Sequence, residues 1–194
     1  MATVAKAPSS NDLQSTLARD WAVQVDLAFG TSDSEEDNWA FVRGLSQFAP
    51  SFTPGMQDDS DIDSEGYGSQ IATTIAAKFE GQGRRKGKTT EGNFKQDPGQ
   101  AYVRRVGRKM GLGNVLRARC WRTDGVDEGY EGLFSVEYTE TAGANDALDE
   151  FSFSMQSRGK PTEIHPVATP NGPSVPIDED EDETPGTGGG AEGN

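Results

Sequence analysis

The chain has 194 residues, of which 32% are hydrophobic and 24 are glycine, so we expect one domain with part of the chain outside its core. It contains no long apolar run, and its first residues lack the apolar centre of a signal peptide, so we expect neither a membrane span nor a secreted product. The formal net charge of −14 argues against tight wrapping around nucleic acid, and a single cysteine excludes an intramolecular disulfide.

Residues 1–19 carry few sizeable apolar side chains, among them Leu13 and Leu17. They offer too little surface to bury alone, so we expect an N-terminal arm that becomes ordered against a partner. Residues 20–166 are then expected to form one β domain.

The first half of this domain predicts three strands. Apolar side chains alternate from Trp21 to Phe29, which is typical of a strand with one buried face. Apolar residues from Trp39 to Phe48 indicate a second strand, bent near Gly44. A third strand is predicted over residues 69–80, with Ile71, Thr73, Ile75, Ala77 and Phe79 on one half-buried face.

A long acidic loop is expected between the second and third strands, over residues 53–68. Its acids Asp58, Asp59, Asp61, Asp63 and Glu65 suggest calcium at first sight. No starting position places both the glycine and the twelfth-position carboxylate of an EF-hand loop, so that motif is excluded. A looser cation site at residues 58–65 stays open beside a solvated or subunit-contacting loop, and we predict no metal ligand.

A basic loop is expected to follow over residues 81–90. The spacing of Gly81, Gly83 and Gly87 does not match a phosphate-binding loop, which needs four residues between its glycines. The remaining interpretations are contact with nucleic acid, a mobile hairpin tip, or a cationic partner for acids on a neighbouring copy. The acidic chain favours the last two.

One helix is predicted at about residues 98–110. Asp97 is suited to the N-cap and Pro98 to the first helical position. Tyr102, Val106 and Met110 form an apolar stripe. We expect Gly111 or Gly113 to end the helix. The opposite face is basic, with Arg104, Arg105, Arg108 and Lys109.

An antiparallel meander is predicted over residues 114–166, with strands around Leu116–Cys120, Phe134–Tyr138 and Phe151–Met155, each with one buried and one solvated face. The chain is therefore expected to be mainly β, a β-sandwich or barrel with one flanking α-helix. Residues 167–194, rich in Gly, Pro and acid, are expected to be a disordered acidic tail. Cys120 and His165 are not positioned by any pattern, so we predict no catalytic residue, no cofactor and no enzymatic activity.

Several segments of residues 19–166 resemble a known family of proteins. The resemblance lies in the segments Tyr102–Arg108, 120–125 and 129–132. Its most specific part is the pattern Phe-x-Phe-x-Met followed by Gly-x-Pro-x-x-Ile over residues 151–164. In these segments the chain resembles the major tail (tail tube) proteins of long, non-contractile-tailed phages, in particular of phages that infect actinobacteria. The resemblance spans residues 19–166. It implies a structural virion protein made in the host cytoplasm, whose hexameric rings stack into the tube through which DNA is ejected. The implied partners are copies of itself, a tape measure protein, a tail terminator and distal tail or baseplate proteins. The C-terminal immunoglobulin-like domain of many relatives has no counterpart here.

We expect the long loop and the N-terminal arm (residues 1–19) to lock successive rings. Contacts with the next ring, which a monomer lacks, would offset the entropy lost when these segments become ordered. The candidate ring-stacking residues are Thr53, Pro54, Met56, Asp58, Asp59, Asp61, Ile62, Asp63, Tyr67, Leu13 and Leu17. DNA would be a cargo that must not stick, so we expect an acidic or neutral channel wall, with Asp26, Glu137, Asp149 and Glu150 as candidates. The alternatives are a tail terminator or head–tail connector of related fold, and a small acidic binding module outside any virion.

Overall fold

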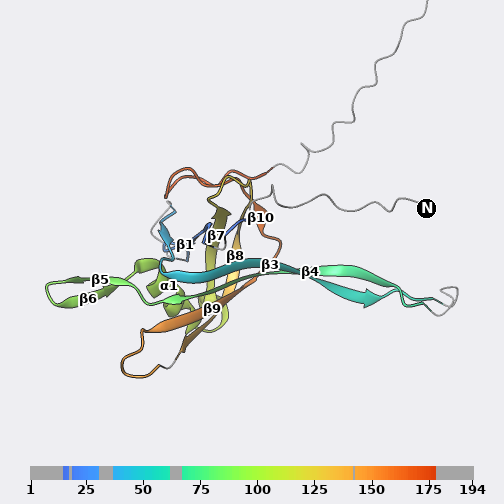
Figure 1. Cartoon of the computed structure of the whole chain (residues 1–194). Coiled ribbons are helices and arrows are strands. Elements are labelled where there is room, and N and C mark those ends of the chain that lie inside the picture. The colour runs from blue at the N-terminus through green and yellow to red at the C-terminus, as the bar shows by residue number, and fades with distance from the viewer. Residues whose placement is uncertain (1–14, 18, 31–36, 62–66, 142, 178–194) are drawn as a thin grey trace, which may run out of the picture.

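The computed structural model describes residues 15–17, 19–30, 37–61, 67–141 and 143–177. Within these ranges the protein is mainly β with one flanking α-helix, which confirms the predicted fold class (Figure 1). The elements are β1 (Trp21–Asp26), β2 (Trp39–Phe41), β3 (Leu45–Asp58), β4 (Gln70–Arg84), β5 (Gly87–Thr90), β6 (Asn93–Gln96), α1 (Pro98–Gly107), a 3-10 turn (Gly111–Asn114), β7 (Val115–Arg122), β8 (Gly129–Thr141), β9 (Glu150–Ser157) and β10 (Thr162–Glu163).

The main sheet is antiparallel throughout, in the order β2-β1-β7-β8-β9-β4-β3, with β10 added to β8. The predicted meander is present as β7, β8 and β9. Its register places Leu116 opposite Phe134 and Val136 opposite Met155. All four side chains are buried, so the alternation in the sequence corresponds to the core face of these strands.

The predicted bend at Gly44 closes this sheet on itself. β2 and β3 lie at opposite ends of the strand order, yet residues 42–44 join them directly in the chain. Gly44 has φ +80°, and its carbonyl accepts a hydrogen bond from the Arg84 N–H at 2.9 Å. One bent strand therefore pairs with β1 before the bend and with β4 after it, and the sheet is rolled rather than flat.

The core fills the inside of this rolled sheet. Val25 from β1, Leu116 from β7, Phe79 from β4 and Phe134 from β8 are all fully buried, and the rings of Phe79 and Phe134 lie 4.3 Å apart. Helix α1 adds its apolar face, formed by Tyr102, Val103 and Val106. Complete removal of these aromatic and aliphatic groups from water is the main stabilising contribution to the fold.

The helix is shorter than the sequence predicts. Asp97 caps it by accepting from the Gln100 N–H, and Pro98 occupies the first turn, as expected. It ends at Gly107, however, and Met110 is 91% exposed instead of continuing the apolar stripe. The Val106 carbonyl at the helix end accepts from the Lys109 N–H at 2.9 Å and from the Asn114 side chain at 3.2 Å.

The first part of the predicted loop over residues 53–68 is a strand instead, because Thr53–Asp58 belong to β3, whereas residues 59–61 and 67–68 are in no strand. β3 and β4 are far longer than expected, and they pair from Leu45↔Gly83 to Asp58↔Gln70. The outer part of this hairpin, which we call the arm (residues 52–61 and 67–77), extends beyond the barrel (Figure 1). Ile71 and Ile75 were expected to be half-buried, but they are exposed because the arm has no layer packed over it.

The basic segment is also more regular than expected. Residues 81–84 complete β4, while β5 and β6 form a separate two-stranded hairpin. Its turn residues Glu91 and Gly92 have φ values of 50° and 78°, the positive pair that tight hairpin turns need.

The boundary expected at residue 167 requires correction. Residues 167–177, which we call the C-terminal clasp, pack back on the barrel instead of leaving it. The His165 N–H donates to the Val175 carbonyl and the Ile177 N–H to the Glu163 carbonyl, both at 2.9 Å. The clasp is fixed by main-chain hydrogen bonds that its polar composition does not reveal. Residues 178–194 lie outside the described residues.

Candidate assembly surfaces

The arm and the β5–β6 hairpin project from opposite ends of the molecule (Figure 1). The unpaired edges of the arm and both outer edges of the small hairpin are available for further contacts within the described part of the chain. Exposed strand edges of this kind are sites where another chain can add. The two hairpins are therefore the first candidates for contacts between copies.

The arm presents an apolar strip. Phe52, Pro54 and Met56 alternate along β3 and so share one face, and Ile75 lies directly opposite Pro54. The register shift at Gly55/Met56 adds a bulge that twists this outer part. Phe52 packs against the Tyr130 ring, with the centroids 4.8 Å apart, and a groove of about 740 Å³ lies beside this pair. Pro54, Met56 and Ile75 are exposed. An apolar surface that no part of the described chain covers is typical of a protein interface.

The candidate stacking residues that the structure describes lie on the arm or ahead of β1. Thr53, Pro54, Met56 and Asp58 lie on β3, and Asp59, Asp61 and Tyr67 lie near the tip of the arm. Leu17 is exposed ahead of β1. Leu13, Ile62 and Asp63 fall outside the described residues.

A second surface is the outward face of β3, β4, β9 and β8. It forms a hollow of about 540 Å³ lined by Gln47, Ala49, Glu80, Gln82, Glu137, Thr139, Ser152 and Ser154. The register places Glu80 and Glu137 on either side of Ser154, so small polar side chains separate two carboxylates. Lys78 and Arg84 flank it on β4, and both are paired with acids, Lys78 with Glu80 at 2.7 Å and Arg84 with Glu150 at 3.4 Å. This face is polar and carries the carboxylates of Glu80 and Glu137.

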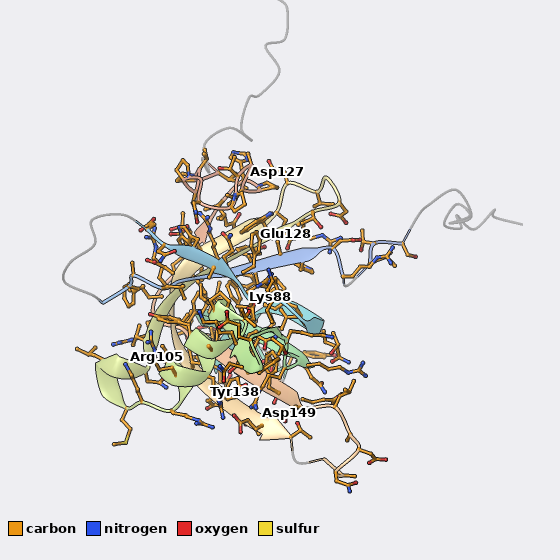
Figure 2. The ribbon with its side chains drawn as sticks, turned by 90° about the vertical axis from the view of Figure 1, so that its left-hand side faces the viewer. Lys88, Arg105, Asp127, Glu128, Tyr138 and Asp149 are labelled. Carbon is orange, nitrogen blue, oxygen red and sulfur yellow. The ribbon has the colours of Figure 1, made fainter. Side chains whose placement is uncertain are left out.

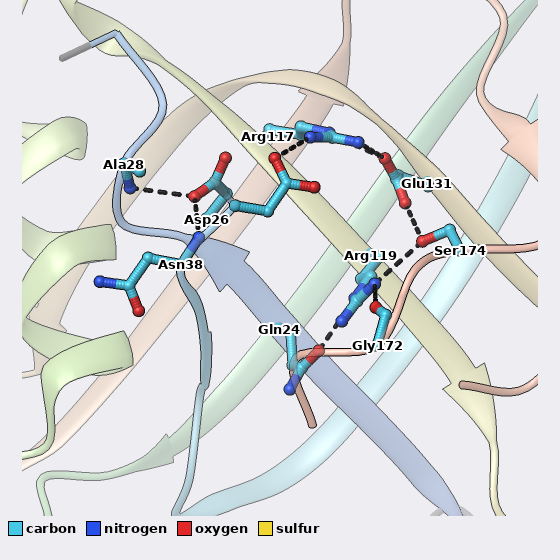
Figure 3. A network of polar contacts seen from close by, with 10 residues as sticks. Gln24, Asp26, Ala28, Asn38, Arg117, Arg119, Glu131, Gly172 and Ser174 are labelled. Carbon is cyan, nitrogen blue, oxygen red and sulfur yellow. Dashed lines mark hydrogen bonds and ion pairs between the residues drawn. The ribbon is translucent and has the colours of Figure 1, made fainter. Parts of the chain in front are cut away.

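Of the four predicted channel residues, Glu137 lines that hollow, and Glu150 lies on the same face at the start of β9. Asp26 is buried, because its carboxylate accepts from the backbone N–H groups of Ala28 and Asn38 at 2.9 and 3.1 Å, so its predicted role is wrong (Figure 3). Asp149 and Glu150 are paired with Arg85 and Arg84, respectively, at the end of the β8–β9 hairpin.

The basic helix face meets an acid of the same chain. The Glu140 carboxylate accepts from Arg104, Arg85 and Arg108, the last two at 3.0 Å. Burial would raise the pKa of Glu140, but the three arginines outweigh it and lower that pKa. Arg105 lies over the Tyr102 ring at 5.0 Å, and Lys109 is exposed beyond the helix end. Figure 2 shows Arg105 on the outer side of the helix. Arg104 and Arg108 therefore fasten α1 to β8, whereas Arg105 and Lys109 do not.

The clasp covers a buried arginine that the sequence pattern placed on a solvated strand face. Arg119 is fully buried and donates to Gln24, to the carbonyls of Pro170 and Gly172, and to the Ser174 hydroxyl (Figure 3). Its guanidinium also stacks on Trp39, 4.0 Å from the ring centroid. Burial lowers the pKa of Arg119, though it remains a cation. Sequence reasoning missed this site because the acceptors come from β1 and from the clasp, which are distant in sequence, and two of them are main-chain carbonyls.

No group of metal-binding side chains was found among the described residues. His165 pairs with Asp127 at 2.9 Å, near the end of the molecule marked by Asp127 in Figure 2. Cys120 lies in the core, and burial raises its pKa well above the usual value, so this thiol is inert. No helix in the described ranges is long and apolar enough to cross a membrane.

Comparison with known proteins gives structural matches only. No family model and no curated protein matches the chain. A chain from the virion of a native gene transfer agent particle is 16% identical, with a TM-score of 0.55, and the match covers 77% of this chain and 98% of that one. A chain from the tail of an empty gene transfer agent particle, determined with C6 symmetry, has the same identity and coverage and a TM-score of 0.57. The fold is therefore shared with a subunit of a phage-like particle.

Proposed function

We propose that this protein is a structural subunit of a phage-like tail, and that its copies form hexameric rings stacked into a tube through which DNA passes. The observation that carries the proposal is the match to a tail solved with C6 symmetry, which covers 98% of that chain. The resemblance of residues 19–166 to tail tube proteins points the same way. The site of action is then the virion tail.

The surfaces support this proposal independently of the match. A ring requires a contact between two different patches, repeated by rotation until it closes. The arm and the β5–β6 hairpin supply projecting elements at opposite ends of the molecule. Neither is covered within the described chain, so each is available to a neighbouring copy.

The outward face of β3, β4, β9 and β8 is the best candidate for the channel wall. A wall of small polar groups and carboxylates such as Glu80 and Glu137 repels phosphate and leaves DNA free to slide. A wall rich in arginine would hold it. Several arginines of the described chain instead form ion pairs elsewhere, at Glu140 and Glu131 for example.

Electron microscopy of the purified full chain at rising concentration tests the proposal. We expect six-fold rings and tubes. A protein that stays monomeric at every concentration would contradict it.

A shortened arm tests the role of that element. Replacing residues 55–74 by Asn-Gly keeps the Pro54↔Ile75 pair next to a turn of the favoured type. We expect a folded monomer, checked by circular dichroism, that forms no tubes. Normal tubes from this variant would show that the arm is not a ring-stacking element.

A further inference from the structure

The β5–β6 hairpin contains an unfavourable charge arrangement. Lys88 and Lys95 lie directly opposite each other in its register. Like charges at such positions destabilise a strand pair, and a lone two-stranded hairpin has little stability to spare. Neither lysine forms an ion pair with any residue in the described part of the chain. Figure 2 looks onto the end from which this hairpin projects and labels Lys88.

The surroundings of these lysines are also basic. Arg43, Lys86, Lys88 and Lys95 line a hollow of about 400 Å³ beside the hairpin. The acid in its lining is Asp97, which is buried and already holds Arg43 and the helix N-terminus. The hollow therefore has the charge and the space to receive carboxylates from outside.

The opposite end of the molecule carries the complementary charge. Asp58, Asp59 and Asp61 lie at the tip of the arm, and the sequence contains no Lys or Arg between Gly44 and Ala77. The arm thus has no cation of its own. In Figure 1 the arm and the β5–β6 hairpin point in opposite directions, so the acidic tip cannot reach the hairpin of its own chain.

We propose that the β5–β6 hairpin binds the acidic tip of the arm of a second copy, with Lys88 and Lys95 as the central cations. The proposal rests on the proposed function and names the contact that joins one copy to the next. It is a head-to-tail contact between two different surfaces, the type that builds closed rings and stacks. The carboxylates relieve the repulsion between Lys88 and Lys95, so the hairpin is fully stable only in the assembly.

Charge reversal in the full chain tests this contact. The variants are K88E/K95E on the hairpin, D58K/D59K on the arm, and the combination of all four. Lys109→Glu with Arg158→Glu is the control, because it makes the same charge change at exposed positions elsewhere. The readout is the critical concentration for assembly, measured by sedimentation velocity. The monomer fold is checked by circular dichroism.

We expect each reversal to raise the critical concentration about tenfold or more, since like-charge contacts across an interface are strongly unfavourable. The combined variant should return close to the wild-type value, and the control should stay near it. If the wild type forms tubes and K88E/K95E behaves as the control does, the contact is wrong while the proposed function stands. If the wild type never assembles, the proposed function itself fails.

These variants, together with a chain ending at residue 177 and a DNA-binding assay, distinguish two other ligands of the hairpin. If a chain ending at residue 177 fails to assemble while D58K/D59K assembles normally, the hairpin binds the acidic segment 178–183 instead of the arm. If K88E/K95E abolishes binding of a short DNA duplex at physiological salt and leaves assembly unchanged, the hairpin binds phosphate. Either result overturns the proposal.

Discussion

The rings of Trp21 and Phe48 pack with their centroids 5.9 Å apart, although β7, β8, β9 and β4 separate their strands in the order of the sheet. The contact is possible because the sheet rolls up and the chain turns at Gly44. The two ends of the sheet meet here, at what we call the seam. Gln100, buried on α1, stabilises the seam by donating to the carbonyls of Arg43 and Arg84. The seam is the point on which closure of the barrel depends.

Gly44→Ala is expected to destabilise the protein by about 3 kcal/mol or more, because strained backbone and steric overlap add. Residue 44 has φ +80°, and an added Cβ would lie 2.7 Å from the Arg84 carbonyl oxygen. Gly30→Ala is the control, with φ +79° and open space around it. It should cost only about 1 kcal/mol in urea unfolding. Equal losses would show that closure does not depend on close approach at this position.

Arg119→Met is expected to lower the free energy of unfolding by about 2–3 kcal/mol, since several buried acceptors lose a charged donor. It should also release the clasp, so limited proteolysis should cut within residues 167–177. Arg158→Met, at an exposed position, should change stability by less than about 0.5 kcal/mol. A clasp that resists the protease in the Arg119→Met variant would contradict this role.

The Glu140 cluster predicts acid sensitivity. Because the three arginines lower its folded-state pKa below the ordinary 4.5, its stabilising contribution is complete above pH 4.5 and is lost as the pH falls through the folded-state pKa. The melting temperature of the wild type should therefore fall below that pH, and Glu140→Gln should lose less over the same window. Glu137→Gln, which removes a carboxylate outside the cluster, should follow the wild type. Identical acid profiles for Glu140→Gln and the wild type would exclude the cluster as a cause.

Glu137→Lys tests the channel face. If this face lines the tube, assembled Glu137→Lys tubes should retain a short DNA duplex in a salt-dependent manner, whereas wild-type tubes should not. Asp146→Lys makes the same charge change in the exposed β8–β9 turn. Retention measured by co-sedimentation should be stronger for the channel variant. Equal retention by both would show that Glu137 is not on the channel wall.

The elements that the sequence predicts well are those whose side chains alternate over a buried core. The meander and the helix start at Asp97 follow from local patterns, as does β1, although β1 ends at Asp26 and not at Phe29. The arm could not be predicted in this way, because Pro54, Gly55 and Asp58 are poor strand formers and the pairing partner supplies the order. Local propensity was overridden by a long antiparallel register.

The surfaces were harder to predict than the fold. Asp26 looked like an exposed acid, but two backbone N–H groups that arrive from a turn hold it inside. Arg119 looked solvated, but residues more than fifty positions away cover it. The Lys88–Lys95 pair becomes visible only once the hairpin register is known. Contacts between distant segments decided each case.

The buried Cys120 gives the molecule a practical property. As the single cysteine of the chain, and with its thiol sealed in the core, it should stay unmodified by maleimide reagents under native conditions. A new cysteine placed at an exposed position such as Val126 would then be the sole labelling point, so spin or fluorophore spacings between neighbouring copies could be measured without first re-engineering the interior.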